Sequence, residues 1–227
     1  MTKTLAGLAA VSLLLTGALS GCGVAGTDFH PGVAARVGDD TVSVSRVDTV
    51  ASDYCGAIEK QLVGQGQVVP LRYLRGYVAG QLALVAAARQ LGEQYDVGPG
   101  AQYDQKVAQL ESAVADLPQD QQDAVVEIEA STTYIATVLQ AVGEQVLGSQ
   151  GGKKSAAGKA GEKAFTSWLD EHGVEVDPQF GVAIEDGKAV QTDTSVSYAL
   201  GDTAVQGDAK TPDTAYAAGL PDSQRCG

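Results

Sequence analysis

Histidine is scarce in this chain of 227 residues, which has only two. His30 and His172 lie far apart along the chain, and neither stands in a Ser/His/Asp, Cys/His or HExxH context of the kind that nucleophilic catalysis or zinc binding uses. No P-loop occurs either. Asp116, Asp120 and Asp123 gather near a turn but lack the spacing of a calcium loop, so helix capping and solvation explain them better. We expect no catalytic residue, no metal site and no cofactor.

Positive charge is also in short supply. The chain has 15 Lys and Arg against 28 Asp and Glu, a formal net charge of −13. Nucleic acids and anionic lipid headgroups repel such a protein, so we expect no nucleic-acid partner. Beyond the N-terminal segment no apolar run approaches the roughly 18 residues that a membrane-spanning helix needs. A basic surface or a second membrane span would therefore not hold this protein at a membrane.

The N-terminal segment carries the most informative motif. Lys3 supplies a positive charge, and Leu5 to Leu19 form an apolar run too short to span a bilayer comfortably. Leu19-Ser20-Gly21-Cys22 reads as a lipobox, the processing site of bacterial lipoproteins. We expect residues 1–21 to be a signal peptide and the Cys22 thiol to carry a diacylglycerol thioether; a chance cysteine behind an ordinary signal is the alternative. Two or more long acyl chains would then anchor the protein on the extracytoplasmic face of the cell membrane.

Once Cys22 is assigned to lipid, two cysteines remain. Cys55 and Cys226 are an even pair in an oxidising compartment, and we predict a disulfide between them. The bridge would close a loop of 226 − 55 = 171 positions, for which chain entropy gives a stabilisation of about 5 kcal/mol as an upper figure. Two buried free thiols, or a bridge to another protein, are the alternatives.

The first half of the chain predicts a short hairpin followed by helices. After a small, polar spacer over residues 22–32, apolar residues alternate at 33–37 and 41–44, which predicts a β-hairpin. Ser45 is the expected N-cap of a helix over 46–63, with Asp48 as a weak capping partner. A second helix is expected from Pro70 to the Gly98-Pro99-Gly100 break, with small residues that let another backbone approach.

The second half predicts a helical hairpin and then irregular structure. Two heptad seams, joined by a turn at 116–120, indicate an antiparallel helical hairpin: Tyr103, Val107, Leu110, Val114 and Leu117 on the first arm, and Val125, Ile128, Thr132, Ile135, Leu139, Val142 and Val146 on the second. We expect a flexible, basic linker over 148–161, then a short helix with Phe165, Trp168 and Leu169 on its buried face. A strand at 174–176 that can pair with the N-terminal hairpin, and a polar tail from 182 with a possible strand at 196–200, complete the chain.

Two segments resemble a known family. Residues 33–48 (VAARVGDDTVSVSRVD) and 168–181 (WLDEHGVEVDPQFG) are similar to the two ends of the N-terminal chaperone domain of SurA, PrsA and their relatives, and the pattern is closest to actinobacterial lipoproteins with such a domain. The resemblance covers about residues 33–181 and implies a mainly α fold: a SurA N-terminal-like helical domain with a small β-hairpin and a long helical hairpin. Members often insert a parvulin prolyl-isomerase domain between the helical arms. Here residues 148–161 stand in its place, and the parvulin histidine pair has no counterpart, so isomerase activity should be absent.

These inferences predict a membrane-anchored, extracytoplasmic chaperone-like lipoprotein whose clients are unfolded or newly exported proteins. Tyrosine covers apolar surface at low entropic cost, so the candidate client contacts are Tyr73, Tyr77, Tyr95, Tyr103 and Tyr134. A dedicated interaction or scaffold lipoprotein that serves one envelope protein complex is the main alternative. An enzyme or a small-ligand binder is the third.

Overall fold

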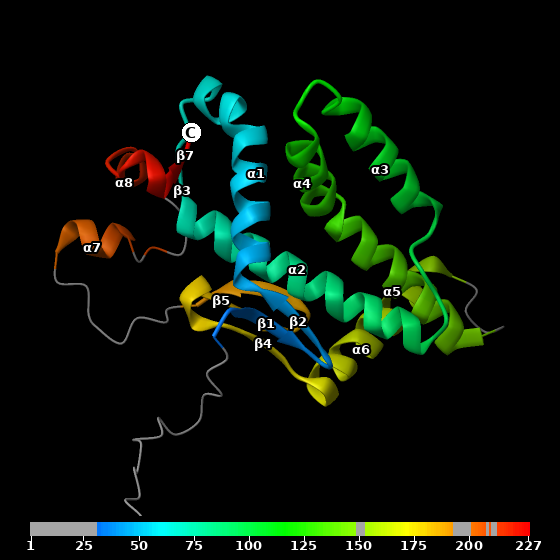
Figure 1. Cartoon of the computed structure of the whole chain (residues 1–227). Coiled ribbons are helices and arrows are strands. Elements are labelled where there is room, and N and C mark those ends of the chain that lie inside the picture. The colour runs from blue at the N-terminus through cyan, green and yellow to red at the C-terminus, as the bar shows by residue number, and fades with distance from the viewer. Residues whose placement is uncertain (1–30, 149–152, 193–200, 208, 210–212) are drawn as a thin grey trace, which may run out of the picture. The chain divides into compact units, whose positions relative to one another are not determined.

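The strands at the beginning of the domain form its central sheet. The computed structural model describes residues 31–148, 153–192, 201–207, 209 and 213–227, and Gly32–Gly227 form a single compact unit (Figure 1). Strand β1 (Val33–Val37) pairs with β2 (Asp40–Ser43) on one edge and with β4 (Val174–Val176) on the other, both antiparallel. The predicted hairpin and its pairing with residues 174–176 are confirmed. The signal peptide, Cys22 and the predicted strand at 196–200 lie outside the described residues.

Helix α1 (Val44–Gly64) begins one residue after β2 ends. Its N-cap is Ser43, whose side-chain oxygen accepts a hydrogen bond from the Arg46 N–H at 3.1 Å. The expectation of Ser45 as N-cap is wrong because the extended backbone of the last strand residue already aims a hydroxyl at the first turn. The carboxylate of Asp48 pairs instead with Arg75 on the next helix.

Helix α2 (Leu71–Gln94) is the longest element and contacts most of the others. It follows the short strand β3 (Val69–Pro70). Two of its glycines admit the chain that returns after β4: a Cβ on Gly76 would lie 2.4 Å from the Phe180 carbonyl oxygen, and a Cβ on Gly80 would lie 2.6 Å from the Ala189 Cβ. The close backbone approach expected from the small residues of this helix is therefore present.

The segment that approaches α2 was expected to begin a polar tail. The structure has a 3₁₀ turn (η2, Pro178–Phe180) and then an antiparallel hairpin, β5 (Val182–Glu185) with β6 (Lys188–Gln191). Val182 is buried on α2, and Gly187 takes a positive φ in the hairpin turn. The sequence did not indicate these two strands because each has only four residues and a charged turn lies between them. The hairpin packed on α2 therefore ends at Gln191, ten residues beyond the expected end of the domain at residue 181.

The predicted helical hairpin is present, but its second arm is divided. Helix α3 (Ala101–Ala113) turns back into α4 (Gln119–Glu129), and α5 (Ser131–Leu147) follows after one residue, Ala130. The Ser131 hydroxyl lies 2.6 Å from the Ile128 carbonyl oxygen, a side-chain bond that bends helices. Two predicted seam residues, Thr132 and Val146, are exposed, while Val138, which was not among them, is fully buried.

The linker expected over 148–161 is wrong for its described second half. Helix α6 (Lys154–His172) begins at residue 154 and packs along α5. A Cβ on Gly143 would lie 1.8 Å from the Ala157 carbonyl oxygen, and a Cβ on Gly161 would lie 1.8 Å from the Leu139 carbonyl oxygen. Gly161, one of the glycines that suggested a linker, thus serves a helix contact that no larger residue permits. Phe165, Trp168 and Leu169 are buried as predicted.

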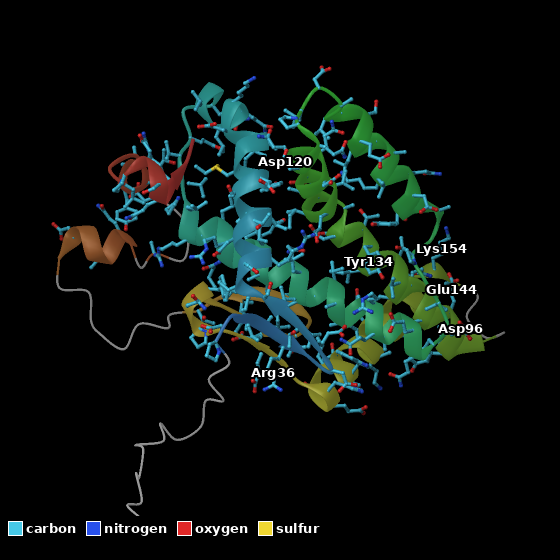
Figure 2. The ribbon with its side chains drawn as sticks, viewed as in Figure 1. Arg36, Asp96, Asp120, Tyr134, Glu144 and Lys154 are labelled. Carbon is cyan, nitrogen blue, oxygen red and sulfur yellow. A yellow bond between two sulfur atoms is a disulfide. The ribbon has the colours of Figure 1, made fainter. Side chains whose placement is uncertain are left out.

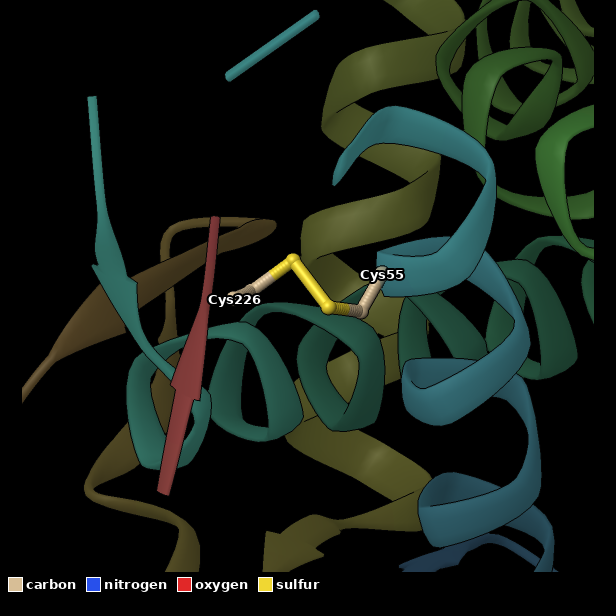
Figure 3. The surroundings of a disulfide bond; sticks show 2 residues. All are labelled: Cys55 and Cys226. Carbon is tan, nitrogen blue, oxygen red and sulfur yellow. A yellow bond between two sulfur atoms is a disulfide. The ribbon is translucent and has the colours of Figure 1, made fainter. Parts of the chain in front are cut away.

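The C-terminal segment returns to the start of α2. After α7 (Asp202–Gly207), α8 (Thr214–Ala218) and a 3₁₀ turn (η3, Asp222–Gln224), strand β7 (Arg225–Cys226) pairs with β3. Cys226 is bonded to Cys55 of α1, with the two Cα atoms 5.7 Å apart, which confirms the predicted disulfide (Figure 3). The bridge ties the penultimate residue of the chain to the first helix.

Buried side chains form two clusters along α2. The first joins α1, α4 and the N-terminal half of α2 with Phe180 and Cys226; the second joins α5, α6 and the C-terminal half of α2 with the central sheet. In Figure 1, α2 crosses the unit between the helices α1 and α4 and the small strands. The fold is mainly α, as predicted.

Candidate functional site

The five tyrosines singled out from the sequence share one property: each side chain is half-buried. Tyr73 and Tyr77 lie on α2, Tyr95 directly follows that helix, and Tyr103 and Tyr134 lie on α3 and α5. Their rings are therefore fixed against the helices while part of each stays in contact with solvent. The structure separates them into two groups, one at each end of α2.

The first group gathers around Glu129 at the junction of α1, α2 and α4. Tyr77 packs against the first cluster, and burial raises its pKa, with the nearby charge of Glu129 and then Tyr73 as smaller causes. Tyr54 on α1, which is not one of the five, joins this group. Its hydroxyl donates a hydrogen bond to the Glu129 carboxylate, and burial, followed by that bond, raises its pKa strongly.

The second group lies where α3 and α5 meet the end of α2. The Tyr103 and Tyr134 rings form an edge-to-face pair with centroids 5.3 Å apart. Burial raises the pKa of Tyr134, and the nearby Arg89 acts in the opposite direction. Tyr95 packs against the second cluster, as does Tyr134, which Figure 2 labels on α5. The heptad pattern predicted that the two arms lie antiparallel, which places Tyr103 near the later part of the second arm. It did not predict the contact between Tyr103 and Tyr134, because Tyr134 is not one of the seam residues.

This arrangement supplies aromatic surface with hydroxyl groups at its edges. A ring that is half-buried offers one apolar face to a ligand and loses little conformational freedom on binding. Over the described residues, no group of three or more His, Cys, Asp or Glu side chains is placed to hold a metal ion. The partly exposed rings are distributed over both ends of α2 and are not gathered in one place.

The remaining residues considered from the sequence have structural roles in the described chain. The Trp168 ring is buried and stacks on His172 with centroids 4.4 Å apart, and the His172 Nδ1 lies 3.0 Å from the Trp168 carbonyl oxygen. Asp120, at the start of α4 in Figure 2, accepts a hydrogen bond from the Gln121 N–H, and Asp123 accepts one from the Gln119 amide. Neither bond caps the helix, because the N-cap of α4 is Pro118, so the expectation that these aspartates cap a helix is wrong for Asp120 and Asp123; both are exposed acidic residues in the first turns of α4, where negative charge is favoured.

Comparison with protein-family models, curated proteins and solved structures finds no match. Among the helices that the structure describes, none is long and apolar enough to cross a membrane.

Proposed function

We propose that the protein is a membrane-anchored, extracytoplasmic lipoprotein that binds unfolded or newly exported proteins and has no prolyl isomerase activity. The observation that supports this proposal is the set of five half-buried tyrosines. Four of them lie on α2, α3 and α5, and the fifth, Tyr95, directly follows α2. Such rings can contact apolar stretches of a non-native chain weakly and reversibly, without a pocket that would demand one particular ligand.

Export is supported by two cysteine-based features. The sequence Leu19-Ser20-Gly21-Cys22 fits lipid attachment at Cys22. The disulfide between Cys55 and Cys226 fits a compartment in which such bonds persist, outside the reducing cytoplasm. The two features are read from different parts of the protein, the first from the N-terminal sequence motif and the second from the geometry of the folded domain.

The lack of isomerase activity is supported by the connection between α5 and α6. Only residues 148–153 separate Leu147 from Lys154. In the SurA-like proteins that this chain resembles, a parvulin domain is placed between the helical arms. A connection this short leaves no chain from which such a domain could form.

An aggregation assay tests the binding proposal. The Cys22→Ser full chain, added in several-fold molar excess, should slow the aggregation of an unfolded exported protein. Tyr73→Ala and Tyr103→Ala together should weaken that effect, whereas Tyr216→Ala on α8, a tyrosine that is not one of the five, should leave it unchanged. No effect of the parent protein on aggregation would overturn the proposal.

Capture from membranes separates the proposal from its main alternative. A client-binding protein should return a heterogeneous set of exported proteins. A single partner in stoichiometric amount would instead favour a scaffold lipoprotein of one envelope complex.

A further inference from the structure

Helix α6 begins with a concentration of lysine that stands out in so acidic a protein. The chain has 15 Lys and Arg against 28 Asp and Glu. Its residues 153–163 nevertheless include four exposed lysines, which we call the lysine patch: Lys153, Lys154, Lys159 and Lys163. Because this segment is a helix and not the expected linker, these lysines extend from one folded element.

The patch lysines have no ion-pair partner in the part of the chain that the structure describes. The ion pairs that it shows there all use arginine: Arg46, Arg75, Arg89 and Arg225. No patch lysine takes part, although Glu162 lies three residues after Lys159 and Glu144 follows the Gly143 that contacts α6. The positive charge of the patch is therefore left for a partner outside the domain.

Helix α6 itself does not profit from lysines at these positions. Lys153 is its N-cap and Lys154, labelled in Figure 2, is its first residue, where the helix dipole disfavours a cation. Its first turn has no acidic residue. Lys159 and Lys163 lie four residues apart, a spacing at which like charges repel. Residues that break such local rules without a structural gain are expected where a protein functions.

The patch lies at the start and on the outer side of α6. The residues that face the domain are buried: Ala157, Gly161, Phe165, Trp168 and Leu169. At the helical spacing of 3.6 residues per turn, Lys159 and Lys163 lie on the opposite side of the helix. A flat, negatively charged surface could contact these two lysines and the helix start together.

We infer that the lysine patch lies against the anionic lipid headgroups of the membrane to which the chain is anchored, and so determines which side of the domain faces the bilayer. Clusters of about four or more basic residues recognise anionic lipid in this way. The acyl chains hold the protein at the membrane, and the patch orients it against the repulsion of the remaining acidic surface. This inference rests on the lipid attachment in the proposed function.

The chain between the anchor and the domain is long enough for this contact. Cys22 and Val33 are 33 − 22 = 11 positions apart, which span at most about 40 Å. Helix α6 leads through one residue into β4, which pairs with β1 so that Val174 lies opposite Val37. Val33, four residues from Val37 on β1, is about 13 Å along the strand from that point. The start of β1 therefore stays within reach of the anchor when the outer side of α6 lies on the bilayer.

Amine labelling on vesicles tests the contact. The chain from Cys22 to Gly227 contains the whole compact unit and can be coupled through Cys22 to a maleimide lipid, since the native disulfide does not react. A water-soluble acetylating reagent should then modify the patch at least about fivefold more slowly on vesicles of phosphatidylglycerol and phosphatidylcholine in equal parts than on pure phosphatidylcholine. Peptide mass spectrometry gives the rate at each lysine. The controls Lys60 on α1 and Lys106 on α3 should react equally on both kinds of vesicle.

Charge removal tests whether the patch acts as a unit. Lys159→Gln with Lys163→Gln should bring the labelling of the other two patch lysines on anionic vesicles up to the rate on neutral ones. The matched control, Lys60→Gln with Lys106→Gln, removes the same charge from α1 and α3 and should leave the protection unchanged. Circular dichroism of both variants checks that the helices stay folded.

Equal labelling of the patch on the two kinds of vesicle, or equal slowing at Lys60, would overturn the inference. That result would leave the proposed function standing, because coupling supplies the anchor and no client is involved. Failure of lipid attachment is measured separately, by phase partitioning of the Cys22→Ser variant from cells.

Discussion

The hydroxyl of Tyr54, in the third turn of α1, donates a hydrogen bond to the carboxylate of Glu129, the last residue of α4, across 75 positions of sequence. The phenol ring is almost entirely buried, so its hydroxyl has one polar partner and little water. This contact closes the edge of the first cluster between α1 and α4. It also connects α4 to the helix that the disulfide fixes.

Tyr54→Phe should lower the free energy of unfolding by about 1–2 kcal/mol, because it removes a hydrogen bond to a charged acceptor while the ring still fills its site. Urea denaturation at neutral pH measures the change. Tyr73→Phe, which removes the hydroxyl of a half-buried tyrosine on α2, is the control and should change the midpoint little.

Alkaline pH should destabilise the wild type more than Tyr54→Phe. Burial and the bond to Glu129 raise the pKa of Tyr54 in the folded state above its ordinary value of 10.0. The folded state thus keeps a proton that the unfolded chain releases, and this part of the stability is complete below pH 10 and lost above it. The unfolding free energy of the wild type should fall more steeply above pH 10, by up to about 1.4 kcal/mol per pH unit, than that of the variant. Parallel curves would contradict this.

Gly161→Ala should destabilise the protein by about 2–4 kcal/mol, since its Cβ would meet the backbone of α5 and force the helices apart. The matched control is Gly158→Ala in the same helix, whose Cβ would lie 3.5 Å from the Gln140 side-chain oxygen, an ordinary contact. That variant should gain about 0.5–1 kcal/mol from helix propensity. Thermal unfolding of both variants gives the comparison, and similar melting temperatures would refute the close α5–α6 contact.

Cys55→Ala with Cys226→Ala should cost about 2–5 kcal/mol, because the unfolded chain regains the freedom that the long loop had lost. A thiol reductant should lower the denaturation midpoint of the wild type toward that of the variant and leave the variant unchanged. If the wild type responds no differently from the variant, the bridge does not stabilise the domain.

Cys22→Ser should move the protein from the detergent phase to the aqueous phase after phase partitioning of whole-cell extracts, since the acyl chains would have no thiol to join. A neighbouring change such as Ser20→Ala, which keeps a small residue before the cleavage site, should not have this effect. Persistence of the serine variant in the detergent phase would refute lipid attachment at this residue.

Periodicity predicted the helices well where one face is apolar, and it could not predict what bends or pairs them. The seam from Tyr103 to Leu117 is half-buried along its length, as its spacing indicates. The division of the second arm into α4 and α5 at Ala130 coincides instead with one hydrogen bond, from the Ser131 hydroxyl to the Ile128 carbonyl in the preceding turn. The hydrogen bond between Tyr54 and Glu129 depends on how α1 meets α4, which no local sequence pattern reports.

Composition was misleading for the start of α6. Gly158 and Gly161, with several lysines, are typical of a flexible connection when the segment is considered alone. The helix forms because Gly161 and Gly143 let two backbones approach more closely than any side chain allows, and that stabilisation belongs to the pair of helices. The cysteine pair, by contrast, could be predicted from counting alone, because assigning Cys22 to lipid left a single possible intramolecular bridge.

The placement of β1 in the middle of its sheet has a consequence for biogenesis. Its second neighbour, β4, is made from residues 174–176, and the sulfur partner of Cys55 is one residue from the end. A polypeptide delivered amino terminus first therefore holds β1 with one edge open, and Cys55 with a free thiol, until residues 174–176 and then Cys226 have followed. The sheet and the bridge are completed only after the helices between these residues have emerged, and until then the nascent chain exposes the kind of surface that we propose the folded protein binds.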